Sequence, residues 1–245
     1  MKNIVVEGHR GWAAKYPENT MLSYIKAMEL GVDAIEFDVW LTSDKVPVLM
    51  HDGNAARTCG VSKIISQMTL EEVKTQLEPC YREKFGEEFA GQGLTVPTLE
   101  ELLIYCKEHH PSIKLGVEIK EYIEENVDLT VALLKKYGFF DSCYFYAFNA
   151  RIIKYLKTRY DGRTMGYPDL LMFEFEEDSY SYYKEIGISL RVARSEAASL
   201  FLSKGLPMHF YCADNEEDVK MCIEKGADLI TANDPVPLMK YLGRL

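Results

Sequence analysis

The feature that most constrains the fold of this chain is a regular alternation of short apolar runs and amphipathic helical patterns. Apolar runs that alternate with helices are typical of βα units, whose strands lie parallel in one sheet. Eight such runs in 245 residues predict an α/β fold, a TIM-like (β/α)8 barrel, with a doubly wound sheet as the alternative. The predicted strands are 4–7, 34–40, 115–119, 143–147, 164–167, 188–192, 209–213 and 228–231.

Several of the predicted helices carry recognisable end signals. The segment 19–31 begins with Asn-Thr and ends with Gly, a combination typical of a capped helix. Two Thr-Leu-Glu-Glu sequences, at 69–72 and 98–101, have the spacing of capping boxes. A later helix is predicted for 215–226, where Asn precedes it and Gly ends it.

One further strand, 47–50, follows 34–40 too closely for a helical crossover. We therefore predict a β-ribbon with a two-residue turn at 44–45. In that register Asp38 pairs with His51, so the two side chains share a face of the ribbon.

Residues 52 to about 113 separate this ribbon from the next barrel strand. They contain two capped helices and a glycine-rich stretch from Gly86 to Gly93. We interpret residues 1–245 as a single barrel domain with an inserted subdomain at about 52–113 that lies over the barrel mouth.

Charge and composition argue against several classes of partner. The net charge is −10, whereas nucleic-acid and anionic-membrane surfaces need clustered Lys and Arg. The chain has no run of about 18 apolar residues, and its six cysteines are scattered without a C-x-x-C pair. We therefore predict a cytoplasmic protein with reduced thiols, no nucleic-acid partner and no stable membrane association. The sequence does not specify an oligomeric state.

Polar residues gather at the predicted carboxyl ends of the early strands, which is where barrel enzymes keep their active sites. Residues two apart on a strand point to the same face, so each acidic pair is expected to project together. These clusters are His9-Arg10-Gly11, Glu36 with Asp38, His51-Asp52, and Glu118 with Lys120.

Three converging carboxylates, Glu36, Asp38 and Glu118, would repel one another without a cation among them. An oxygen-only ligand set suits a hard divalent ion such as Mg²⁺ or Ca²⁺ better than Zn²⁺. Arg10 and Lys120 beside that ion would offer fixed positive charge to a phosphate group.

Two histidines at the rim, His9 and His51, could supply a general acid and a general base. Together with a metal and a cationic clamp, they are what an in-line displacement at a phosphodiester needs. Each component alone has a more ordinary reading, because a lone histidine or a Glu-x-Asp pair is more often a packing or solvated feature. The combination at strand ends is what points to catalysis.

The order of these motifs resembles that of the glycerophosphodiester phosphodiesterase family, part of the phospholipase-C-like phosphodiesterase superfamily. The resemblance is dense in the amino-terminal half and thin afterwards. The matching segments are His9-Arg10-Gly11, Pro17-Glu18-Asn19-Thr20, 31–39, Thr42 with Asp44, Val48 with His51-Asp52, and Glu118-Ile119-Lys120.

The resemblance implies a metal-dependent hydrolase of lipid and glycerol metabolism that converts glycerophosphodiesters to glycerol 3-phosphate and an alcohol. The implied metal ligands are Glu36, Asp38 and Glu118, for a divalent ion, Mg²⁺ or Ca²⁺. His9 and His51 would be the acid–base pair, without an assignment of which is which.

By the same resemblance, Arg10 and Lys120 would hold the phosphate. Glu18 lies in the matching Pro-Glu-Asn-Thr segment and is either a substrate contact or a structural loop residue. Asn19 is expected to serve at least partly as a helix cap.

The carboxyl-terminal half departs from the family pattern. The Ser-Phe-Asn expected at a strand end reads 147–149 Ala-Phe-Asn, and the usual Trp-Thr-Val-Asn reads 211–214 Tyr-Cys-Ala-Asp. The late Thr-Asp segment becomes 231–233 Thr-Ala-Asn. Tyr211 could still stack on the substrate where the family places a Trp. Because the catalytic motifs match the family and these later motifs do not, the sequence specifies the reaction better than the substrate.

Two other functions fit the same barrel. One is a lipid phosphodiesterase resembling phospholipase C or sphingomyelinase D, which would need an apolar or basic rim. The other is a barrel that binds phosphodiesters without turnover. Outside the site, 173–183 is interpreted as an amphipathic helix, 109–110 as helix-capping histidines, and His209 as structural.

Overall fold

The structure, a computed structural model, describes residues 3–196 and 198–245. Its centre is a closed barrel of eight parallel strands, which confirms the predicted fold class. Neighbouring strands pair around the ring, and β1 pairs with both β2 and β9 and so closes it. The barrel strands are β1 Val5–Gly8, β2 Ala34–Leu41, β4 Lys114–Ile119, β5 Cys143–Tyr146, β6 Thr164–Gly166, β7 Glu185–Ser189, β8 Met208–Tyr211 and β9 Leu229–Ala232.

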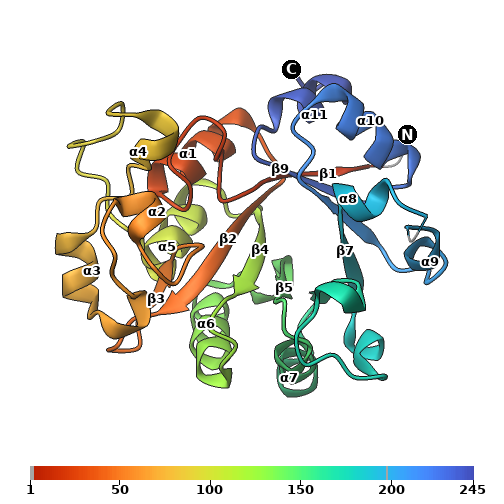
Figure 1. Ribbon diagram of the computed structural model, residues 1–245, viewed down its shortest axis with the longest axis horizontal. Coiled ribbons are helices and arrows are strands. Elements are labelled where there is room, and N and C mark those ends of the chain that lie inside the picture. Colours follow the sequence, from red (N-terminus) through yellow and green to blue (C-terminus); the bar gives the residue numbers. More distant parts are fainter. Residues whose placement is uncertain (1–2, 197) are drawn as a thin grey trace.

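Helices in the connections between strands cover the outside of the barrel (Figure 1). None of the helices in the described part of the chain has both the length and the apolar character needed to cross a bilayer. The α-helices are α1 Met21–Leu30, α2 Ala56–Cys59, α3 Leu70–Gln76, α4 Arg82–Phe85, α5 Leu99–His109, α6 Glu124–Tyr137, α7 Ala150–Tyr160, α8 Leu190–Ala193, α9 Ala198–Leu202, α10 Glu216–Glu224 and α11 Val236–Tyr241. Short 3-10 turns are η1 Ile65–Gln67, η2 Phe140–Ser142, η3 Asp169–Leu171 and η4 Ser179–Tyr182.

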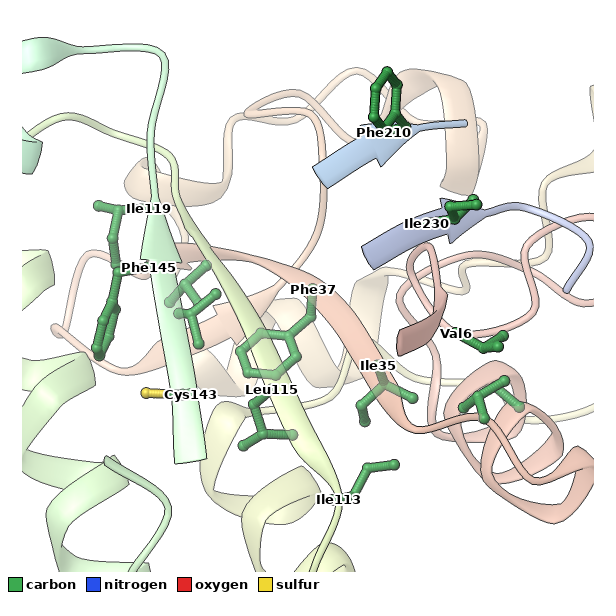
Figure 2. Packing of buried hydrophobic residues seen from close by; sticks show 14 of the residues in the cluster. Val6, Ile35, Phe37, Ile113, Leu115, Ile119, Cys143, Phe145, Phe210 and Ile230 are labelled. Carbon is green, nitrogen blue, oxygen red and sulfur yellow. The ribbon is translucent and has the colours of Figure 1, made fainter. Parts of the chain in front are cut away.

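The alternation along β2 separates the core from the site. Ile35 and Phe37 are fully buried in the main apolar cluster, between the barrel and its helices, where Leu115 of β4 packs with them (Figure 2). Glu36 and Asp38 alternate with these residues along the strand and therefore point into the barrel. One strand thus supplies both packing outside and carboxylates inside.

Most of the predicted helix ends are confirmed. Thr20 caps α1, where its side chain accepts a hydrogen bond from the Ser23 amide, and Gly31 ends the helix in the left-handed conformation with φ of 92°. Both capping boxes are present, at the starts of α3 and α5. Asn215 caps α10.

The sixth barrel strand, β7, differs from its predicted position. Sequence pattern predicted 188–192, but β7 is Glu185–Ser189 and Ser189 instead caps α8 through the Val192 amide. The strand begins with Glu185, a charged residue that the pattern assigned to a loop. Glu185 is buried because it forms ion pairs with His209 and Arg163.

The prediction of an amphipathic helix at 173–183 was wrong. Only the short turn η4 forms there, and Glu174 has φ of 49°. The backbone of Phe173 instead exchanges hydrogen bonds with the Phe148 carbonyl and the Ala150 amide. These bonds to the loop after β5 replace the helical ones.

A second apolar cluster lies beneath the segment that follows the ribbon strand β3 Pro47–Leu49. In Figure 1, α2, α3 and α4 lie together on this side of the molecule. Helix α5 belongs to the barrel instead, because Leu99, Leu102 and Leu103 join the main cluster. The second cluster comprises Val48, Met50, Ala55, Cys59, Ile65, Met68, Val73, Leu77 and Val96.

Candidate active site

The turn after β1 brings Arg10 over the barrel mouth. Arg10 and Gly11 both have left-handed backbone conformations, with φ of 52° and 86°. A Cβ atom at position 11 would lie 2.5 Å from the Ser23 backbone, so only glycine fits this turn. The Arg10 amide donates a hydrogen bond to Glu36 Oε2 at 2.8 Å, which joins the turn to β2.

Three carboxylates meet inside the mouth. Glu36 and Asp38 come from β2, and Glu118 from β4 stands opposite Asp38 in the strand register. One oxygen from each lies within 4.8 Å of the others, and all three side chains are buried. The convergence predicted from the period-two spacing is therefore present.

Burial and mutual repulsion make this trio difficult to ionise. Burial, with repulsion from Asp38, raises the pKa of Glu36 well above its ordinary value. Burial also raises the pKa of Glu118 to about 7. Burial works in the same direction on Asp38, but the Lys120 ammonium and Arg10 guanidinium outweigh it and lower the pKa of that carboxyl.

A divalent cation suits this arrangement. Glu36 Oε1 is buried and has no hydrogen-bond partner among the described residues. This oxygen is therefore available to bind a metal ion. The three side chains offer only oxygen donors, which favours a hard ion. Such an ion would offset the repulsion that raises the pKa values of Glu36 and Glu118.

Two cations flank the carboxylates. Arg10 Nε lies 3.3 Å from Asp38 Oδ2, and Lys120 Nζ lies 3.1 Å from Asp38 Oδ1 and also contacts Glu118. Both cationic side chains are largely buried, at 15% and 10% exposed. A phosphate entering the mouth would meet fixed positive charge beside the trio.

His9 stands at the edge of the trio, with Nε2 3.8 Å from Glu36 Oε2. Its Nδ1 lies 2.7 Å from the side-chain oxygen of Asn233, whose amide nitrogen donates to Asp214. Burial, with the nearby Arg10 guanidinium, lowers the pKa of His9 to about 4. The imidazole is therefore neutral near pH 7.

His51 reaches the same cavity, but not by the predicted ribbon register. Asp38 stands opposite Met50, whose amide donates to the Asp38 carbonyl, so the pairing is one residue from the prediction. The ribbon turn has three residues instead of two, because Lys45 adopts a left-handed conformation with φ of 66°. His51 lies just beyond β3, with Nδ1 2.6 Å from Asp52 Oδ1.

The cavity beside these groups holds about 170 Å³ and is partly lined by aromatic rings. Phe148 and Tyr167 stack at 4.1 Å, and Tyr211 meets Tyr167 edge-on at 5.5 Å. Tyr211 therefore lies in the site, where the sequence predicts it. The lining residues are Glu7, His9, Arg10, His51, Glu118, Tyr146, Phe148, Met165, Tyr167, His209, Tyr211 and Thr231.

Comparisons with known proteins agree with this geometry. The sequence model of the glycerophosphoryl diester phosphodiesterase family matches residues 9–236. A glycerophosphodiester phosphodiesterase of Caldanaerobacter subterraneus subsp. tengcongensis is 30% identical over 260 residues, 99% of this chain and 98% of the relative. The chain belongs to the glycerophosphoryl diester phosphodiesterase family.

Solved structures share the fold of this family member. An Oleispira antarctica phosphodiesterase in complex with the product sn-glycerol-3-phosphate has a TM-score of 0.84 at 24% identity, covering 98% of this chain and 96% of that one. A glycerophosphodiester phosphodiesterase from Agrobacterium tumefaciens has a TM-score of 0.77 at 22% identity, covering 95% and 97%. Family membership makes the protein an enzyme, a phosphoric diester hydrolase.

Two residues near the phosphodiesterase site differ from their expected roles. Asn19 does not cap α1; its amide donates to Asp38 Oδ2 at 2.8 Å, and Tyr24 donates to its oxygen. Glu18 accepts from Arg10 at 2.7 Å and, with both oxygens, from Arg57. These bonds leave Glu18 only 7% exposed.

Sequence reasoning missed Arg57 altogether. It lies on α2, where Nε donates to Asp52 Oδ2 at 2.6 Å while both terminal nitrogens hold Glu18. Arg57 therefore joins Glu18, which bonds Arg10, to Asp52, which bonds His51. The only signal in the sequence was an arginine five residues after Asp52, which by itself reads as a surface charge.

Proposed function

We propose that this enzyme hydrolyses glycerophosphodiesters to sn-glycerol 3-phosphate and an alcohol, with a divalent metal and a pair of histidines. The observation that carries the proposal is the arrangement of one cavity. Glu118, Arg10 and both imidazoles line it. Glu36 and Asp38 complete a carboxylate trio within 4.8 Å, and Lys120 contacts Asp38 and Glu118. Family membership gives the reaction class, and this arrangement supports the roles that we propose for the residues.

We assign Glu36, Asp38 and Glu118 as the ligands of Mg²⁺ or Ca²⁺. A bound ion of this kind would neutralise their charge and supply Lewis-acid activation of the phosphodiester. Arg10 and Lys120 hold the phosphate oxygens through charge-assisted hydrogen bonds. Because Glu18 is occupied by two arginines, we propose that it positions Arg10 and does not touch the substrate.

His9 and His51 act as the acid–base pair. Asn233 presents a side-chain oxygen to His9 Nδ1, and Asp52 presents a carboxylate to His51 Nδ1. Each acceptor favours a proton on Nδ1 and leaves Nε2 for proton transfer. One imidazole removes a proton from the nucleophile, and the other protonates the departing alcohol.

We further propose that Arg57 is a positioning residue for both ends of this machinery. It holds Asp52, which orients His51, and it holds Glu18, which orients Arg10. A planar guanidinium can make these bonds together, which a lysine ammonium cannot reproduce.

Tyr211 and its aromatic neighbours would contact the organic part of the substrate. We expect little dependence on the alcohol released and no stable membrane association. We also propose a cytoplasmic location, which suits the six free cysteines. Cell fractionation would test that location, and recovery in an oxidising compartment would contradict it.

The test of the proposed function is a coupled assay for glycerol 3-phosphate with a deacylated phospholipid diester. We expect exhaustive EDTA treatment to abolish product release, and Mg²⁺ or Ca²⁺ to restore it, because the trio needs a cation. Full activity after metal removal would contradict the metal assignment. Turnover of bis(p-nitrophenyl) phosphate without any glycerol 3-phosphate would contradict the substrate.

A further inference from the structure

A second polar group of residues lies one layer below the catalytic groups, inside the barrel. Glu7 precedes His9 by two residues on the β1 side, and His209 and Thr231 come from β8 and β9. All three line the same cavity as His9, Arg10 and Glu118. The floor of the active site is therefore polar, where barrel interiors are usually filled by branched apolar side chains.

The atoms of this floor are only partly hydrogen-bonded. Glu7 Oε2 accepts from the Thr231 hydroxyl at 2.6 Å, and His209 Nε2 lies 2.7 Å from Glu185 Oε2. Glu7 Oε1, His209 Nδ1 and the Tyr144 hydroxyl have no hydrogen-bond partner within the described ranges. Each of these side chains is at most 3% exposed. Unsatisfied buried polar atoms are costly, so three in one place indicate that a partner binds there.

Gly116 leaves the space for that partner. A Cβ atom at this position would lie 2.6 Å from Glu7 Oε1 and 2.7 Å from the Tyr144 hydroxyl. The two oxygens therefore face the same point beside β4. His209 adjoins it, because its ring meets the Tyr144 ring edge-on at 4.9 Å.

The charges of the floor select the kind of ligand. Burial, together with repulsion from Glu185, raises the pKa of Glu7 to about 8, so the carboxyl is mostly uncharged at neutral pH and can donate as well as accept. Glu185 pairs with the Arg163 guanidinium and also contacts His209. The floor thus carries no free cation for a phosphate and suits a neutral hydroxyl group.

We propose that Glu7, Tyr144 and His209 form a hydroxyl-binding subsite that recognises the glycerol end of the substrate. This inference rests on the proposed function, since it takes the phosphate to be held above by Arg10 and Lys120. The terminal glycerol hydroxyl lies farthest from the phosphate and reaches the floor. A site built to bind a hydroxyl discriminates against analogues that lack it, because its own polar atoms are then left unpaired.

The test compares two diesters with the same leaving alcohol, one of glycerol phosphate and one of propane-1,2-diol phosphate, which lacks the terminal hydroxyl. We expect the wild-type enzyme to prefer the glycerol diester by about 10- to 100-fold in kcat/KM. Glu7→Leu should reduce this preference at least fivefold. Glu7→Gln, which keeps a donor and an acceptor, should retain most of it and serves also if the leucine variant fails to fold.

Tyr144→Phe and Tyr183→Phe form a matched pair. Both tyrosines are buried with hydroxyls that lack a partner in the described structure. The Tyr144 hydroxyl lies with Glu7 Oε1 beside Gly116, whereas the Tyr183 ring packs against Gly166. The preference should fall in the first variant and stay in the second. A preference that is unchanged in Glu7→Leu, Glu7→Gln and Tyr144→Phe would mean that water alone occupies the floor, and would overturn the inference. Absence of wild-type turnover on the glycerol diester would instead overturn the proposed function, and the inference with it.

Discussion

At the scale of single residues, the site is held by a chain of alternating charges. Arg10 bonds Glu18, Glu18 bonds Arg57, Arg57 bonds Asp52, and Asp52 bonds His51. The phosphate clamp and one catalytic histidine are therefore fixed by the same set of bonds. Arg57 is the member whose removal would loosen both ends.

We expect Arg57→Lys to lower kcat about 10- to 100-fold with a smaller change in KM, since small misplacements of catalytic groups have effects of this size. The pH profile of kcat/KM should shift on one limb, because Asp52 loses its partner and His51 titrates differently. Steady-state kinetics across pH measures both effects. Arg82→Gln is the control, since Arg82 is an exposed arginine that pairs with Glu87 on the same inserted segment. Equal losses in both variants, or an unshifted profile, would contradict the positioning role.

The residues that could be predicted from the sequence are those whose position follows from strand periodicity. Glu36 and Asp38 had to share a face, and Glu118 had to end a nearby parallel strand. Arg57 and Asn233 could not be predicted, because each depends on how a loop or helix folds back over the mouth. Asn19 was predicted to serve at least partly as a cap because asparagine is a common N-cap residue, but Thr20 caps α1 and leaves Asn19 to bond Asp38.

At the scale of elements, turns decide where the strand-end residues point. The three-residue ribbon turn moved the pairing by one position, yet His51 still reaches the cavity because it lies past the end of β3. Strand β7 was misplaced because buried ion pairs allow a strand to begin with a charged residue. Polarity alone does not show which charges will find buried partners.

The turn after β1 gives the clearest test at this scale. Gly11→Ala should destabilise the protein by roughly 2–4 kcal/mol, because it combines a left-handed backbone with a backbone clash. Gly60→Ala is the matched control, since Gly60 has φ of 73° but no atom within 4 Å of an added Cβ. It should cost about 1 kcal/mol. Urea unfolding of the two variants measures the difference, and similar losses would contradict the clash.

At the scale of the whole molecule, the barrel was predictable because most of its eight strands are separated by helices, several of which have clear caps. The polar barrel interior was not, since Glu7 and Glu185 look like surface residues in the sequence and His209 was interpreted as a structural residue, whereas it lines the active-site cavity. Their burial is possible only because strands distant in sequence bring them together.

Burial of Glu7 should make stability depend on pH. Its pKa rises from an ordinary value of 4.5 to about 8 on folding, so the native state binds this proton more tightly than the unfolded state. The contribution is fully present below about pH 4.5 and is lost as the pH rises through about 8. Between pH 5 and 8, wild type should therefore lose stability relative to Glu7→Gln, by on the order of a few kcal/mol. Parallel urea titrations measure this difference, and identical pH dependence would contradict the assignment.

We propose that His9 and His51 act together as one acid–base pair on a glycerophosphodiester. Glycerol 3-phosphate release by wild type, His9→Ala and His51→Ala should therefore be measured across pH. We predict a bell-shaped kcat/KM profile for wild type and a loss of roughly 10²- to 10⁴-fold in each variant. The double variant should be little worse than either single one, because a concerted pair fails as a unit. Near-wild-type turnover by His51→Ala on every substrate would contradict the account.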